Sequence, residues 1–254
     1  MKKVVLILSC LFAFACINDA LAQDKKKKEK VKKEKKEYVW EMPALTGNEG
    51  FDKYLLTCDT LYNRISTYRD SVTFYHIVLD FDIDAQGDTI FNPRMIDDEG
   101  NARGTALAAM QYSDMFKTGT SLLADLVIIT AETASATASL PSLGTKALSY
   151  AKYVKAGPKI LSMGTSEVKD IMGKISVQRK QIRSIRKYYK TLQDKENPNA
   201  VADANKIITV ELTDIPRVVW TTEQRVAADV QEKKDNEEAV DKGFDPDSDD
   251  EELI

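Results

Sequence analysis

The 254-residue chain carries 36 Lys and Arg against 40 Asp and Glu, a formal net charge of −4, and 8% of its residues are aromatic. Its length suits one domain with tails and is enough to bury a hydrophobic core. The overall charge is too small to indicate a partner. The sequence contains no Walker loop and no G-x-G-x-x-G motif, which excludes those nucleotide sites, and it lacks the Arg and aromatic pattern of nucleic-acid binding.

The first residues have the pattern of a secretory signal peptide. Two lysines precede an apolar stretch at 4–17, and the small-x-small triplet Ala20-Leu21-Ala22 follows. The apolar stretch is shorter than the ~20 residues that a membrane-spanning helix needs. We therefore expect a signal peptide at 1–22, cleavage after Ala22 and an exported protein that is periplasmic or associated with the cell envelope. A lipoprotein anchored through Cys16 is the alternative.

Charge runs mark both ends of the expected mature chain. Residues 23–37 are rich in Lys and Glu and predict a disordered spacer, and residues 232–254, with eleven acids and three lysines, predict a disordered acidic tail. Between them, 38–231 is expected to form a single helix-rich domain. Cys58 is the one cysteine left after cleavage, so the fold has no internal disulfide to rely on.

The first half of that domain changes its hydrophobic period twice. Residues 38–47 read as a short strand that ends at Pro43, and 51–72 carry an apolar stripe at helical spacing that includes Cys58. From Thr73 the period is two, with Tyr75, Ile77 and Leu79 on one face and His76, Val78 and Asp80 on the other. Turn residues at 85–88 and 97–101 enclose a return strand at 89–91.

The second half is mostly helical by the same criterion. A long helix begins near Thr105 and ends at Ser139-Leu140-Pro141, a shorter one at 145–155 ends at Gly157-Pro158, and 167–192 carries a heptad repeat with Gln178 on its seam. Residues 208–212 and 218–220 read as strands, and 223–231 as a polar helix. The fold class is thus α+β and predominantly helical: long amphipathic helices packed as a bundle or coiled-coil hairpin, with a small antiparallel sheet.

One segment resembles part of an EF-hand calcium loop. Asp82, Asp84 and Gln86 place oxygens at its first, third and fifth positions and Gly87 stands at the sixth, but the position that should supply a bidentate acid is Pro93. A hairpin turn explains the same residues, so whether Asp82 and Asp84 bind calcium stays open. We expect no metal site, because Cys58 and His76 are a lone pair of zinc ligands.

Catalytic motifs are present only in fragments. Three S-x-x-K matches, at Ser149, Ser166 and Ser184, and the Lys117-Thr118-Gly119 triplet resemble elements of penicillin-binding proteins, but their order is wrong and no S-D-N follows. His76 is the only histidine. We therefore expect a protein that is not an enzyme and uses no cofactor; a hydrolase with an unidentified site is the second alternative.

Residues 105–165 are unusually rich in Ala, Ser, Thr and Gly, which lets helices approach closely. We expect them to form core and the protein to be a structural or adaptor protein that binds a protein partner, or itself, through helix–helix contacts. The alternative is a peripheral membrane or lipid-binding protein that uses residues 105–192. Its contacts with an anionic lipid surface would come from one basic helix face: Arg179, Lys180, Arg183, Arg186 and Lys187.

Overall fold

The computed structural model describes residues 38–83 and 89–245. The chain divides into two compact units, Met1–Val39 and Trp40–Ile254, and every helix and strand of the described ranges belongs to the second. That unit is predominantly helical with a small sheet, which confirms the expected α+β class. The predicted signal peptide, with its alternative processing sites at Cys16 and Ala22, and the predicted spacer at 23–37 lie outside the described residues.

In chain order, the first three strands lie between α2 and α3, and the fourth lies between α6 and α7. The helices and strands are α2 (Glu49–Ser71), β1 (His76–Ile83), β2 (Thr89–Ile96), β3 (Ala102–Arg103), α3 (Thr105–Ser139), the 3-10 helix η2 (Leu140–Lys146), α4 (Ala147–Val154), α5 (Ala156–Gln193), α6 (Ala200–Glu211), β4 (Arg217–Val218) and α7 (Thr222–Asp241).

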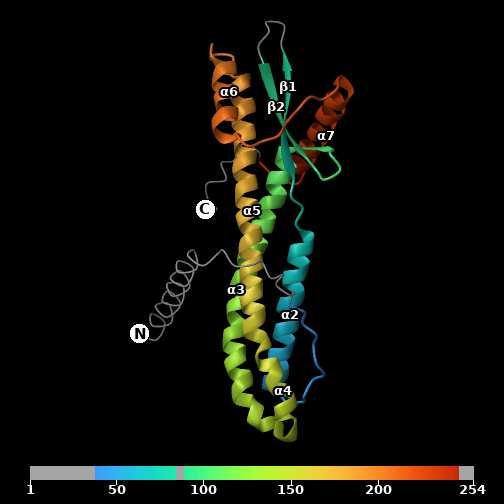
Figure 1. The fold of residues 1–254 in the computed structure, drawn as a ribbon, viewed down its shortest axis with the longest axis vertical. Helices are drawn as coiled ribbons and strands as arrows, with labels where there is room; N and C mark the ends of the chain where they lie inside the picture. Colours follow the sequence, from blue (N-terminus) through green and yellow to red (C-terminus); the bar gives the residue numbers. More distant parts are fainter. Residues whose placement is uncertain (1–37, 84–88, 246–254) are drawn as a thin grey trace, which may run out of the picture. The chain divides into compact units, whose positions relative to one another are not determined.

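Three long helices, α2, α3 and α5, pack against one another as a bundle (Figure 1). The stripes expected from the sequence are the buried ones. Cys58 and Ile65 of α2, Leu126 and Ile129 of α3, and Ile175 of α5 are at most 1% exposed. The helical seams predicted at 51–72, 108–133 and 168–192 therefore meet in one core, as amphipathic helices must to remove their apolar faces from water.

The junction between α4 and α5 differs from the prediction. Gly157-Pro158 does not end a helix; α4 stops at Val154, and α5 starts at Ala156 and runs on without a break to Gln193. Pro158 lies in the first turn of α5, where its missing N–H would have had no intrahelical partner. The Tyr54 hydroxyl of α2 accepts a hydrogen bond from the Gly157 N–H at 2.8 Å, which satisfies one of the amide groups that a new helix leaves unpaired.

The sheet has the strand order β3-β2-β1-β4. β1 and β2 are antiparallel, with Leu79 opposite Pro93, whereas the two residues of β4 run parallel to β1. The sheet is therefore mixed and not purely antiparallel as expected. β2 also continues past Pro93, where we expected it to end, to Ile96. Proline is tolerated here because β3 pairs only with the last two residues of β2, Met95 and Ile96.

The two faces of β1 alternate as the sequence indicates. Tyr75, Ile77 and Leu79 belong to a core cluster with residues of α5 and α6, while Asp80 on the opposite face bonds to Arg225 of α7. The sheet thus has an apolar face toward α5 and α6 and a partly ionic face toward α7.

Two segments predicted as strands are not strands. Residues 38–47 form neither helix nor strand, and 208–212 is largely the end of helix α6. Apolar and polar residues alternate at 208–212, which led us to predict a strand. Ala204, Ile207 and Ile208 also recur at helical spacing, however, and are buried. Packing against α5 and the sheet selects the helical alternative.

α7 is longer than the predicted helix at 223–231 and enters the segment 232–254 that was expected to be a disordered tail. Its added turns cap another helix: Asp235 accepts a hydrogen bond from the Gly104 N–H, and Asn236 accepts one from the Ala106 N–H, both at 2.9 Å. Gly104 has no side chain to cap α3 itself. A distant part of the chain therefore satisfies the first amide groups of α3.

Candidate functional site

A group of buried and half-buried charges lies between the sheet and α7. Asp80 is completely buried and accepts hydrogen bonds from Arg225, at 2.8 and 3.1 Å, and from the Trp220 N–H, at 3.1 Å. Arg225 also reaches Asp82 at 2.5 Å and the carbonyl of Phe81 at 3.0 Å. The oxygens of Asp80 are thus occupied by structural partners, as a buried carboxylate requires.

Arg94 is the second cation of this cluster. Its side chain is 7% exposed and pairs with Asp229 at 2.7 Å and Glu232 at 3.0 Å, and it lies 5.7 Å from the Trp220 ring. Burial raises the pKa of Glu232, and Arg94 opposes that shift. Two arginines here pair with four carboxylates, and no group of three potential metal ligands occurs among the residues that the structure describes. The cluster joins α7 to the sheet.

Side chains of α5 and α6 form hydrogen bonds with the edge of β2 that faces away from β1. Three main-chain carbonyls along it accept hydrogen bonds from two tyrosine hydroxyls and an asparagine amide. The bonds run from Tyr188 to Phe91, from Tyr189 to Pro93 at 3.2 Å and from Asn205 to Thr89 at 3.4 Å. Since an unpaired edge is what a further strand would use, this edge is a poor site for strand addition.

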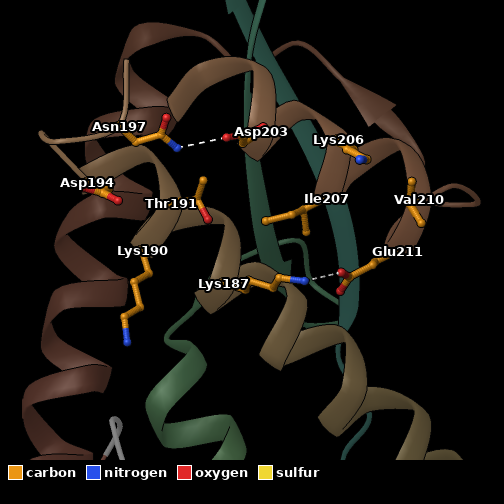
Figure 2. Close-up of a pocket in the computed structure, with 10 residues that line it drawn as sticks. All are labelled: Lys187, Lys190, Thr191, Asp194, Asn197, Asp203, Lys206, Ile207, Val210 and Glu211. Carbon is orange, nitrogen blue, oxygen red and sulfur yellow. Dashed lines mark hydrogen bonds and ion pairs between the residues drawn. The ribbon is translucent and has the colours of Figure 1, made fainter. Parts of the chain in front are cut away.

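A pocket of about 590 Å³ opens between the end of α5 and α6 (Figure 2). Lys187 pairs with Glu211 at 2.8 Å, and Asn197 donates to Asp203 at 3.0 Å. The hydrogen bond from Lys187, followed by that from Ser184, lowers the pKa of Glu211.

The lysine side chains that line this pocket do not point toward a common centre. Figure 2 shows the ammonium groups of Lys187, Lys190 and Lys206 pointing in different directions, with Lys190 extended along α5 and away from the opening. Because three acids line the same pocket, it has no net cationic centre. Neither Asp82 nor His76 lines it. The pocket gives no basis for a reaction or an anion site.

The individual residues considered for chemistry lie apart. His76 is exposed and faces Asp98 at 3.0 Å. Cys58 is buried in the bundle, and burial raises the pKa of its thiol to about 11, which leaves it protonated at neutral pH. Asp82 is held by Arg225, while Asp84, the other residue for which calcium binding was left open, lies outside the described residues. The Ser149 hydroxyl donates to a main-chain carbonyl one turn back, and the Ser184 hydroxyl donates to Glu211 at 2.6 Å.

The basic face expected on residues 179–187 is largely used within the protein. Arg179 is buried with its guanidinium 5.7 Å from the Phe116 ring, and Arg186 donates to the Thr105 carbonyl at 3.2 Å. Lys187 pairs with Glu211, and Arg183 also has a partner. Lys180 is exposed. These five residues therefore do not form a uniform cationic surface.

The outer side of α3 is the most unusual surface of the helical bundle. Six uncharged residues lie there opposite the buried seam, five of them at alternating steps of four and three and the sixth, Val127, beside Ile128, and all are exposed; we call them the outer stripe of α3. They are Ala124, Val127, Ile128, Ala131, Ser135 and Ala138. Val127 is 55% and Ile128 51% exposed. The sequence led us to expect core on this helix, and the structure places core on one side only.

Hydropathy shows the same feature. The helical segment Thr105–Gln193 includes a stretch that is long and apolar enough to cross a membrane by composition alone, yet only 22% of that stretch is buried. The core helix of a soluble protein can have the same composition, but such a helix is mostly buried, and this stretch is not. The apolar composition of α3 thus exceeds what packing against α2 and α5 uses.

Comparison with protein-family models, with curated proteins and with solved structures finds no match for this chain.

Proposed function

We propose that this protein is an exported, non-enzymatic adaptor of the cell envelope that works through helix–helix contacts at the outer stripe of α3. The observation that carries the proposal is the exposed, uncharged heptad spacing of this stripe, from Ala124 through Ile128, Ala131 and Ser135 to Ala138. A sustained stripe of this spacing is what one helix offers another in a coiled coil or bundle.

The chemistry of the stripe suits a close helical neighbour. Alanine and serine let two backbones approach, and the exposed parts of Val127 and Ile128 supply apolar area that association would remove from water. The two acids of this part of α3 are engaged with α2: Asp125 pairs with Arg64 and Glu132 with Lys53, each at 2.6 Å. A docking helix would therefore bury no unpaired charge on α3.

A second copy of the chain meets these requirements. In a two-fold symmetric dimer the same patch of both protomers meets itself, and a stripe without charges brings no like-charge repulsion to that contact. Two α3 helices packed through their outer stripes would join the two bundles side by side.

Sedimentation equilibrium of the intact protein tests this contact. We expect a concentration-dependent dimer that is lost in Ile128→Glu, because two carboxylates would then be buried face to face. Val177→Glu is the matched control, since Val177 is an equally exposed apolar residue of α5, and it should leave the dimer intact. A protein that is monomeric at every concentration, and that a photocrosslinker at Ala131 joins to nothing in its native envelope, would contradict the adaptor function.

Export is tested separately by sequencing the N-terminus of the protein from its own host. A chain that begins at Gln23 supports signal cleavage after Ala22, and an acylated chain that begins at Cys16 supports the lipoprotein alternative. A chain that retains Met1 contradicts export.

A further inference from the structure

A cationic, acid-free segment occupies the end of the bundle where α3 turns into α5. Between Glu132 and Glu167 the sequence has no acidic residue, and its charges are four lysines, Lys146, Lys152, Lys155 and Lys159. This segment includes η2 and α4 (Figure 1). Its charge is opposite in sign to that of the chain as a whole.

The outward side of α4 combines these cations with one prominent apolar residue. Leu148 is 91% exposed, the highest value among the exposed large hydrophobic residues of the described chain. Lys152 and Lys155 follow it at four and seven residues, on the same face of the helix, and the exposed Lys146 lies immediately before α4. We call Lys146, Leu148, Lys152 and Lys155 the α4 tip.

The other side of α4 is fixed to the bundle by its aromatic residues. The Tyr150 hydroxyl donates to the Ala44 carbonyl at 2.9 Å, and its ring packs against Phe51 at 5.8 Å between centroids. The Tyr153 ring lies 6.2 Å from that of Trp40. The tip is therefore held as a short helix that presents one defined face, so binding would not first have to order it.

Nearby acids offset little of this charge. Asp52 lies close enough to Lys146 for an electrostatic contact, but its carboxylate already accepts hydrogen bonds from the Thr46 N–H and hydroxyl, both at 2.7 Å, and from the Gly47 N–H at 2.9 Å. Lys152 and Lys155 have no ion pair within the described ranges, although the Lys152 ammonium lies 4.7 Å from the Tyr153 ring.

We propose that the α4 tip docks on an anionic phospholipid surface. Lysines around an exposed leucine are the combination that interfacial helices use: the ammonium groups stay with the lipid phosphates while the apolar side chain enters the headgroup region. A soluble anion would use the lysines but would leave Leu148 in water. This inference does not depend on the outer stripe of α3, which is formed by different residues.

Binding to sucrose-loaded vesicles measures the contribution of charge. We expect the intact protein to bind phosphatidylcholine vesicles that contain phosphatidylglycerol, to ignore pure phosphatidylcholine, and to lose binding at high salt. Lys146→Gln, Lys152→Gln and Lys155→Gln combined should weaken binding about a hundredfold, from about fivefold per lysine. Lys180→Gln, Lys195→Gln and Lys234→Gln combined change the net charge equally on other exposed surfaces and should cost much less.

Leu148→Trp reports contact at the tip itself and is independent of the Lys-rich residues 24–37, which both triple variants retain. Its fluorescence, after subtraction of the intact protein's signal, should shift to the blue and be quenched by brominated lipid. An unshifted spectrum on bound vesicles, or equal losses for the two triple variants, would overturn the proposal. So would competition by soluble glycerol phosphate, which would indicate a free-anion site. Dimerisation is measured without lipid, so the adaptor function and the lipid contact can fail separately.

Discussion

Asp80 of β1 and Arg225 of α7 are 145 residues apart in the chain and form two hydrogen bonds, at 2.8 and 3.1 Å. Asp80 is completely buried, whereas the Arg225 side chain remains 21% exposed. The same carboxylate also accepts the Trp220 N–H. This one acid thus fixes α7, and the segment that leads into it, on the ionic face of the sheet.

Asp80→Ala should be strongly destabilising, because it leaves Arg225 and the Trp220 amide without their buried partner. We expect a loss of about 2–4 kcal/mol in the free energy of unfolding. Asp125→Ala is the matched control: Asp125 also pairs with an arginine, Arg64, at 2.6 Å, but both side chains are at least one third exposed, and the cost should stay below about 1 kcal/mol. Urea unfolding measures both, and equal costs would show that burial of the pair is irrelevant.

A chain that ends after Gln231, the predicted end of the folded domain, should be less stable than one that ends after Asp245. The shorter chain lacks Asp235 and Asn236, which cap the first turn of α3, and loss of such caps costs about 1–2 kcal/mol. It also lacks the buried Ala239. Thermal unfolding followed by circular dichroism compares the two, and identical midpoints would mean that the added turns of α7 do not support α3.

Sequence periodicity was sufficient to predict the helices and strands whose hydrophobic pattern repeats many times. The buried seams of α2, α3 and α5 and the alternation of β1 are long enough that one period clearly fits best. It failed at α6, where Ile208, Val210 and Leu212 alternate but the helix packs Ala204, Ile207 and Ile208. A segment this short fits both periods, and only its tertiary neighbours select one.

The end of the folded region was missed for a related reason. Composition at 232–254 is that of a solvated tail, yet Asp235 and Asn236 have specific partners at Gly104 and Ala106. A cap whose partner is far away in the chain leaves no pattern in the neighbouring sequence from which it could be predicted. The outer stripe of α3 was read as core because the sequence alone does not show which side of an apolar helix its neighbours cover.

Cys58 should make the protein less stable at alkaline pH. Burial raises the pKa of its thiol from 9.0 to about 11 in the folded state, so above pH 9 the unfolded chain loses a proton that the folded chain keeps. This contribution to the free energy of unfolding is fully present below pH 9 and is lost as the pH rises toward 11, a decrease of up to about 3 kcal/mol. Urea unfolding between pH 8 and about 11 should show a steeper decline for the intact protein than for Cys58→Ala; parallel curves would contradict a buried thiol.

Gly157→Ala and Gly173→Ala should have effects of opposite sign, although both change a glycine in α5. A Cβ at Gly157 would lie 2.4 Å from the Thr133 hydroxyl and 2.9 Å from the Tyr54 hydroxyl, whereas one at Gly173 would meet nothing within 4 Å. Tyr54 cannot yield freely, because its hydroxyl accepts the Gly157 N–H and donates to carbonyls at the end of α4. We expect Gly157→Ala to cost about 1–3 kcal/mol and Gly173→Ala to gain up to about 1 kcal/mol from helix propensity. Urea unfolding of the two variants tests this prediction. A gain in stability at both positions would show that α5 does not pack against Tyr54 as closely as described.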